Sequence, residues 1–307
     1  MPSPEWLIER GIGETRAALV EDGEIVEARV RRDGVVPAGT ILDGKLVAVA
    51  PRMTVEAGGE QFLLPRGAQG VSEGRSLMIE VIREALGGGE PWKRGLARVT
   101  DQATRAATPL AEGKPHVIDC WDDLLAEARE GVVTFDGGEL RIEQTAAMTT
   151  IDVDGWLVLA KLAQMAAWAA ARAIRRLDLA GSIGIDFPTL KGRAERHEVD
   201  AILDDYLPAP FERTAMNGFG FVQIVRPKAR PSLIDLAADR AAFETRALLR
   251  RAGREMGATR LAAHPAVIAV LDAHPDWLDQ LSRQVGGQVT LRSEPSLAMS
   301  GGYAEQA

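Results

Sequence analysis

The chain has 307 residues, a formal net charge of −8 and one cysteine, Cys120. A single cysteine excludes an internal disulfide framework and a cysteine zinc site within one chain, and it fits a reducing cytoplasm. The acidic total argues against broad attraction to nucleic acid, but it leaves room for a local basic groove. The N-terminus lacks the features of a signal peptide, and the Ala-rich candidate span at residues 157–177 carries several cations. We therefore expect a cytoplasmic protein without a membrane span.

Residues 1–95 contain short apolar or alternating runs separated by glycine, aspartate and proline, a pattern typical of a small antiparallel barrel. The segment from Gly87 to Pro91 reads as a linker, and no GxxxxGK[ST] pattern marks it as a phosphate loop. A polar connector follows over residues 96–131 and includes a predicted short helix from Asp122 to Glu130. The sequence thus predicts a β-rich first region and a connector.

The next region, residues 132–235, shows the pattern of an α/β domain. Residues 132–143 carry a hairpin signal centred on an Asp-Gly turn. Two β-branched runs, at 149–155 and 182–187, flank the Ala- and Leu-rich helical segment 157–177. Strand, helix, strand is a βαβ unit, and its right-handed crossover makes the two strands parallel.

Three carboxylates stand at the ends of these two strands. Asp152 and Asp154 belong to the first strand and Asp186 to the second, so parallel pairing would bring them together at one edge of the sheet. Converging carboxylates repel one another unless a cation neutralises them, and hard oxygen ligands favour Mg²⁺, with Mn²⁺ as the alternative. An equally simple interpretation of any one of them is an ordinary turn aspartate.

Downstream of these strands the sequence offers cations that could contact phosphate. A predicted helix begins at Arg193, and a later strand runs into a basic turn that contains Arg226, Lys228 and Arg230. We expect this turn to lie close behind the carboxylate edge and to contact RNA phosphates together with Arg193. A solvated loop explains the turn equally well. Residues 236–307 predict a helix followed by a small α/β unit, with a loose tail from Ser300.

Three stretches of the chain, in the same order, resemble the bacterial ribonuclease E/G family. The run Ile142–Asp154 (IEQTAAMTTIDVD) is similar to the family's IExTEALTxIDVN. The run Arg175–Phe187 (RRLDLAGSIGIDF) is similar to RLRDLGGIIVIDF. Residues 218–233 contain GFGFVQI and RPSL, which are similar to FGLLEM and RxSL. A weaker likeness covers the barrel around Gln61–Pro65.

The resemblance implies a fold, an activity and a site. It implies an OB-type RNA-binding barrel in front of a mixed α/β nuclease domain. Asp152 and Asp186 occupy the positions of the family's two magnesium-binding aspartates, and Asp154 stands where the family usually has asparagine. The implied function is a Mg²⁺-dependent endoribonuclease that hydrolyses single-stranded RNA and leaves 5′-phosphates.

The chain also departs from the family pattern. Trp156 follows Gly155 where the family has Ser-Gly-(Arg/Lys), and the following helix lacks the family's Asn and Glu. The barrel segment Thr54–Gly58 has no aromatic residue where the family stacks bases. The cysteines that join protomers through zinc and most of the 5′-sensor region are missing, so a homo-oligomer would form without a zinc link.

Two other functions remain open from the sequence. A non-catalytic or weakened RNA-binding relative fits the departures from the family. A haloacid-dehalogenase-type phosphatase fits the Asp152-Val153-Asp154-Gly155 run, because that family uses DxDG as its nucleophile loop. The phosphatase pattern has threonine after the glycine, whereas this chain has Trp156 at that position.

Overall fold

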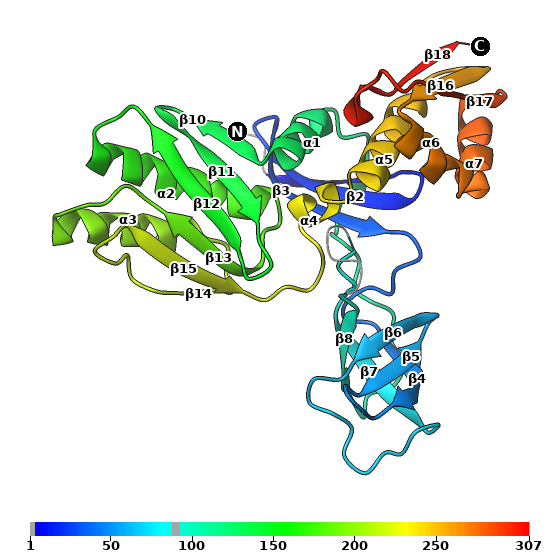
Figure 1. Cartoon of the computed structure of the whole chain (residues 1–307), viewed down its shortest axis with the longest axis horizontal. Coiled ribbons are helices and arrows are strands. Elements are labelled where there is room, and N and C mark those ends of the chain that lie inside the picture. The colour runs from blue at the N-terminus through cyan, green and yellow to red at the C-terminus, as the bar shows by residue number, and fades with distance from the viewer. Residues whose placement is uncertain (1–3, 88–92, 307) are drawn as a thin grey trace.

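The computed structural model describes residues 4–87 and 93–306. The expected linker from Gly87 to Pro91 lies, apart from Gly87 itself, outside the described residues. The described chain contains two open sheets in its centre, a small barrel that projects from them, and a C-terminal α/β unit (Figure 1). This mixed α/β architecture with an N-terminal barrel confirms the expected fold class.

The first sheet has four strands in the order β3-β2-β1-β9. It consists of β1 (Glu5–Arg10), β2 (Glu14–Glu21), β3 (Glu24–Arg32) and the short β9 (Lys114–Pro115). Strands β1, β2 and β3 pair antiparallel, and β9 pairs parallel to β1. The edge strand β9, which completes this open sheet, therefore comes much later in the chain than the other three strands.

The next five strands form a closed barrel. They are β4 (Ile41–Ala48), β5 (Thr54–Ala57), β6 (Glu60–Leu63), β7 (Ser76–Arg83) and β8 (Gly95–Val99). Inward-pointing side chains such as Leu46, Val55, Phe62 and Ile79 are fully buried and fill the interior. A five-stranded barrel of this size is the architecture of the OB fold.

The β-rich region that the sequence predicts over residues 1–95 is divided in the structure. The barrel begins only at Ile41, and strands β1 to β3 belong to the separate sheet that β9 completes. The barrel is thus inserted between two strands of one sheet. Local alternation predicts strands, but it carries no information about which distant strand each one pairs with.

The third part is a six-stranded mixed sheet in the order β10-β11-β12-β13-β15-β14. Its strands are β10 (Val132–Phe135), β11 (Gly138–Gln144), β12 (Thr149–Gly155), β13 (Gly181–Asp186), β14 (Glu212–Arg213) and β15 (Phe221–Arg226). As predicted, β12 and β13 pair parallel, and the two-residue turn at Asp136-Gly137 connects β10 to β11. All other pairs in this sheet are antiparallel.

Helices cover one face of this sheet. The βαβ crossover is α2 (Leu159–Arg176), and α3 (Arg193–Tyr206) packs beside it (Figure 1). Helix α2 is buried on most of its circumference because it contacts both the six-stranded sheet and β3. Its many alanines allow this close approach on two sides. Helix α1 (Trp121–Glu130) contributes Trp121 and Leu124 to the same core.

The C-terminal unit has its own small core. It contains α5 (Arg240–Ala252), β16 (Thr259–Ala263), α6 (Pro265–Asp272), α7 (Pro275–Val285), β17 (Val289–Ser293), a 3-10 turn (Met299–Gly301) and β18 (Tyr303–Gln306). The short α4 (Leu233–Ala237) precedes this unit and packs into the main core. The tail, which we expected to be loose, forms β18 and pairs antiparallel with β16.

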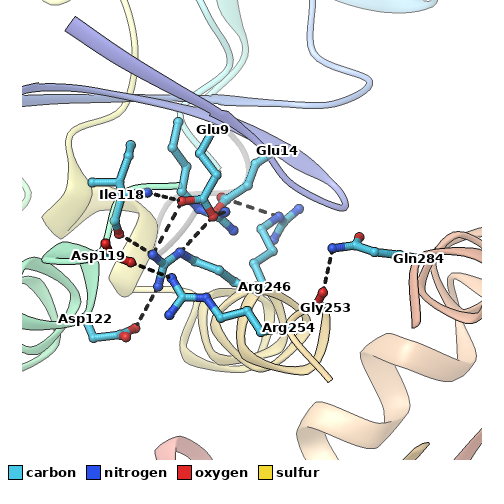
Figure 2. A network of polar contacts seen from close by, with 11 residues as sticks. Glu9, Glu14, Ile118, Asp119, Asp122, Arg246, Gly253, Arg254 and Gln284 are labelled. Atoms are coloured by element: carbon cyan, nitrogen blue, oxygen red, sulfur yellow. Dashed lines mark hydrogen bonds and ion pairs between the residues drawn. The ribbon is translucent and has the colours of Figure 1, made fainter. Parts of the chain in front are cut away.

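A buried ionic network fastens this unit to the centre of the molecule (Figure 2). Arg250 of α5 forms ion pairs with Glu9 of β1 at 2.9 Å and with Asp122 of α1 at 3.1 Å, and it donates to the carbonyl oxygen of Ile118. Glu9 also accepts from Arg16 and from the backbone N–H of Ile118. Arg250 and Glu9 are removed from water, so their charges depend on these partners, whereas Asp122 is half exposed.

Within the described residues, we find no helix of the length and apolar character that crossing a bilayer requires.

Candidate metal centre

The two predicted carboxylates on neighbouring strands are direct partners in the sheet. Asp152 of β12 stands opposite Asp186 of β13 in the parallel register, and Asp154 follows two residues farther along β12. Side chains alternate between the faces of a strand, so these even-numbered residues share one face while Ile151 and Val153 enter the core. All three carboxylates are exposed to solvent. The expected convergence is therefore present in the backbone register.

The place of the carboxylates differs from the expected crevice beyond the strand ends. Asp186 is the last residue of β13, but Asp152 lies inside β12, with three residues of that strand still to come. The helices α2 and α3 occupy the opposite face of the sheet (Figure 1). The site is thus an open face of the sheet, accessible to an extended substrate.

The carboxylates influence one another electrostatically. Partial burial raises the pKa of Asp152, and the negative charges of Asp154 and Asp186 raise it further. A hydrogen bond from the backbone N–H of Val153 and the positive charge of Arg141 act in the opposite direction. Burial is thus the largest cause of the raised pKa, and the two neighbouring carboxylates add to it.

Arg141 is the nearest cation that β11 presents to this face. It stands opposite Asp152 in the antiparallel pairing of β11 with β12. Its guanidinium lies 2.5 Å from Glu139 and 3.8 Å from Asp154. The sequence analysis did not single out Arg141, although the predicted hairpin together with the two-residue period would have placed it on this face.

A metal site with three protein carboxylates is not assembled. Among residues 4–87 and 93–306, no group of three or more His, Cys, Asp or Glu side chains is arranged to hold a metal ion. The role of Asp154 as a third ligand therefore stays a prediction. The pair Asp152 and Asp186 remains, and Mg²⁺ is commonly held by one or two carboxylates with waters and substrate phosphate completing its shell.

The basic turn lies at the end of β13 that is opposite to the carboxylates. Strand β15 runs antiparallel to β13, so its first residue, Phe221, stands opposite Asp186. Its last residue, Arg226, stands opposite Gly181 at the other end of β13. Five residues of strand separate the two ends, or roughly 16 Å. The expectation that the turn lies close behind the carboxylates is therefore wrong.

The side chains of the basic turn are also engaged within the protein. Lys228 forms an ion pair with the buried Asp235 at 2.7 Å, and Arg230 pairs with Asp178 at 2.6 Å. Arg226 donates to the carbonyl oxygen of Leu179 at 2.6 Å, and burial lowers its pKa. These contacts give the three cations structural roles, and their contact with RNA stays a prediction.

Arg193, the fourth predicted cation, lies at the carboxylate edge. It is the first residue of α3, which begins seven residues after Asp186, the end of β13. The side chain is exposed and donates from Nε to His197 at 3.1 Å. Arg193 is therefore the one of the four cations that follows the Asp186 end of β13 in the chain, and its contact with RNA phosphate stays a prediction.

Two aromatic residues that the sequence analysis did not place in the site also lie at this edge. Trp156 follows Asp154 at the two-residue spacing of β12, and its side chain is 80% exposed. Phe219 precedes Phe221, the partner of Asp186, by the same spacing and is 83% exposed. The sequence marked Trp156 only as a departure from the family pattern. That Trp156 and Phe219 are exposed to solvent can be seen only in the structure.

Comparison with known proteins identifies one family. The model of the Ribonuclease E/G family matches residues 121–229, about a third of the chain. The matched segment starts with α1 and contains every strand of the six-stranded sheet, so it includes Asp152 and Asp186. It leaves out the barrel and the C-terminal unit. No curated protein matches the chain. The match supports membership of the ribonuclease E/G family.

Proposed function

We propose that this chain, which belongs to the ribonuclease E/G family through residues 121–229, is a Mg²⁺-dependent endoribonuclease that hydrolyses phosphodiester bonds of single-stranded RNA. One observation carries the proposal: Asp152 and Asp186 are register partners on the open face of the family-matched sheet. We place the reaction in the cytoplasm, because a single cysteine suits a reducing compartment.

The carboxylate pair fits a hard divalent cation. Both side chains are oxygen donors on adjacent parallel strands, and the pKa of Asp152 is raised by burial and then by its acidic neighbours. In the described part of the chain neither Asp152 nor Asp186 has a lysine or arginine partner within ion-pair distance. A bound Mg²⁺ would relieve this repulsion. Mn²⁺ has the same ligand preference and is the alternative ion.

The bound ion would supply polarisation of a phosphate oxygen and an activated water. The protein would contribute the orientation of the substrate. Asp152 and Asp186 would hold the ion that positions the scissile phosphate, and Arg193, the first residue of α3, would attract a neighbouring phosphate. The open face admits a polymer chain from either side, so cleavage within the chain is sterically accessible.

The test is a cleavage assay on an AU-rich single-stranded RNA with a 5′-monophosphate. The wild-type protein should cut it internally with Mg²⁺ and not with EDTA. Asp152→Asn and Asp186→Asn should each abolish cutting. Glu143→Gln, an exposed carboxylate of β11 on the same face, is the matched control and should cut normally.

Other outcomes separate the competing functions. Undiminished cleavage by Asp152→Asn/Asp186→Asn protein would refute the site assignment. Release of phosphate from a small phosphatase substrate, run in parallel, would favour the phosphatase reading of Asp152 and Asp154. Turnover of neither substrate, with RNA still bound, would identify a non-catalytic RNA-binding relative. An oligomer, if one forms, would assemble without a cysteine zinc link, because Cys120 is the single cysteine.

A further inference from the structure

The two most exposed aromatic residues of the described chain stand next to the two strands that flank β13, because Trp156 follows β12 and Phe219 precedes β15. Trp156 is 80% exposed and Phe219 is 83% exposed, whereas Tyr206 and Tyr303 are exposed to 53% and 39%. Large aromatic side chains are normally covered, since each buries a large apolar area when packed. A pair left in solvent at one edge of a sheet indicates a surface that something else covers.

Both aromatics stand on fixed backbone. Trp156 extends the ladder beyond β12, because its N–H donates to the carbonyl oxygen of Gly137 at 3.1 Å. The N–H of Phe219 donates to Oδ1 of Asn217 at 2.8 Å, and the carbonyl oxygen of Phe219 accepts from Thr189 at 3.1 Å. The rings therefore project from ordered positions, which lowers the entropic cost of binding.

The aromatic residues stand next to the strands of the site. Trp156 follows β12, which carries Asp152 and Asp154, and Phe219 precedes β15; β13 with Asp186 runs between these strands. Phe221 of β15 is the register partner of Asp186, and its ring covers Gly184 so closely that an added Cβ would lie 2.6 Å from it. Aromatic residues thus stand beside the strands that carry the three carboxylates.

This combination favours one occupant over others. A protein partner that covered both rings would also bury Asp152, Asp154 and Asp186, and uncompensated buried carboxylates are costly. A nucleic acid strand needs both features, because its phosphate reaches the carboxylates through a cation while its bases need apolar flat faces. The barrel segment where the family has aromatics instead has Thr54 to Ala57, most of it buried.

We propose that Trp156 and Phe219 form a base-stacking platform that holds two unpaired bases of single-stranded RNA on either side of the phosphate at Asp152 and Asp186. The platform takes over the stacking that the barrel segment does not supply. The proposal rests on the proposed ribonuclease function for the position of the phosphate, but it makes its own prediction about binding.

The test measures binding with Ca²⁺ in place of Mg²⁺, so that a hard cation still neutralises the carboxylates, and gel electrophoresis confirms that the RNA stays intact. A fluorescein-labelled single-stranded RNA of about ten nucleotides is compared with an abasic strand of the same length and charge. Trp156→Ala and Phe219→Ala should each weaken binding of the RNA roughly five- to a hundredfold and leave binding of the abasic strand unchanged. The salt dependence of RNA binding should not change, because neither ring carries charge.

Conservative and matched variants complete the design. Trp156→Phe and Phe219→Tyr keep a ring and should bind RNA nearly as the wild type does. Tyr206→Ala removes an exposed aromatic residue at the end of α3, on the helical side of the sheet, and should have no effect. Quenching of tryptophan fluorescence by RNA should be reduced in Trp156→Phe.

Three results would overturn the platform. The first is RNA affinity unchanged in both alanine variants. The second is an equal loss for the RNA and the abasic strand, which would trace the effect to folding or charge. The third is a wild-type dimer that Trp156→Ala converts to a monomer without loss of RNA affinity, which would make the face a protein interface.

Failure of the platform and failure of the nuclease are distinguishable. If Asp152→Asn protein cleaves normally while Trp156→Ala loses RNA binding, the metal site is wrong and the platform stands. If the wild type binds the abasic strand as tightly as the RNA, the platform fails whatever the cleavage assay shows.

Discussion

Asp152 and Asp186 stand directly opposite each other on the parallel strands β12 and β13, with both side chains exposed on the open face of the sheet. Neighbouring strands are about 4.8 Å apart, so the two carboxylates share one small volume. With Asp154 on the same face, their repulsion adds to burial in raising the pKa of Asp152. The two carboxylates thus repel each other in the free protein, and a bound divalent cation would reduce this repulsion.

Mg²⁺ should stabilise the wild-type protein against heat through this pair. A ligand that binds only the folded state at about 100 times its Kd adds roughly 2.7 kcal/mol, which corresponds to several degrees in Tm. Asp152→Asn and Asp186→Asn should show almost no rise in Tm with Mg²⁺, and Glu143→Gln should respond like the wild type. Scanning calorimetry with and without Mg²⁺ measures this independently of activity. An equal rise in the Tm of the Asp152→Asn protein would show that the ion binds at another site.

Without metal, Asp152→Asn should make the protein more stable at neutral pH. The folded-state pKa of Asp152 lies above its unfolded value, so the folded state holds the proton more tightly. Stability therefore falls as the pH rises from the unfolded to the folded pKa, and the wild type carries the full penalty at neutral pH. Because the carboxylate is exposed, the gain should be less than about 1 kcal/mol.

The comparison to make is between neutral and acidic pH. The stability difference between Asp152→Asn and the wild type should shrink as the pH falls below the ordinary range of aspartate. Asp43→Asn, which removes an exposed aspartate of the barrel strand β4, is the control for loss of a carboxylate elsewhere in the molecule. Thermal unfolding in EDTA provides the measurement. A less stable Asp152→Asn protein at neutral pH would show that the carboxylate has a favourable partner.

The central βαβ unit was predictable because its signals are local. β-branched runs ending in aspartate predict β12 and β13, and the handedness of the crossover makes them parallel. A strand over residues 219–225 was also predicted, and β15 (Phe221–Arg226) forms there, but its direction in the sheet was not predicted, because an alternating run reads the same way in both directions. Its antiparallel pairing moves Arg226 to the edge opposite Asp186. The direction of β15 therefore separates the basic turn from the carboxylates.

Other features depend on contacts between distant segments. The tail strand β18 forms only because β16 offers it an edge, and polar residues such as Glu305 and Gln306 gave no local strand signal. The assignment of β1 to β3 to a sheet outside the barrel depends on β9. The exposure of Trp156 and Phe219 depends on what fails to cover them. No local pattern contains that information.

Arg250 should be the more important of two neighbouring arginines in the network of Figure 2. Its guanidinium is buried against Glu9 and the carbonyl oxygen of Ile118, so Arg250→Met leaves a carboxylate without one of its partners. Glu9 keeps Arg16 and the N–H of Ile118 as partners, so we expect a loss of about 2–3 kcal/mol in the free energy of unfolding, less than for a carboxylate left with no partner. Urea denaturation measures the change.

Arg254 is the matched control for Arg250. It also belongs to this network, but its ion pair with Asp119 is 4.0 Å long and both side chains are exposed. Arg254→Met should cost less than about 1 kcal/mol. Equal losses for the two variants would mean that burial does not determine the contribution of the network to stability.

Lys228→Met tests whether the basic turn serves folding or RNA binding. Lys228 pairs with Asp235, whose burial alone would raise its pKa, but Lys228 and the hydrogen bonds from Ser232 outweigh burial and lower it. Removing the ammonium should cost about 2–3 kcal/mol, because the carboxylate stays buried. RNA affinity of the folded fraction should not change, since the turn lies at the edge opposite Asp186.

The pH dependence of this variant follows from the lowered pKa of Asp235. A carboxylate whose folded-state pKa lies below its unfolded value stabilises the fold above the unfolded pKa, and this contribution is lost as the pH falls through the folded pKa. The loss of folding stability caused by Lys228→Met should therefore be largest at neutral pH and become smaller in acid. Lys161→Met, an exposed lysine of α2, is the control for loss of one positive charge. Weaker RNA binding by Lys228→Met at unchanged stability would restore the turn as an RNA contact.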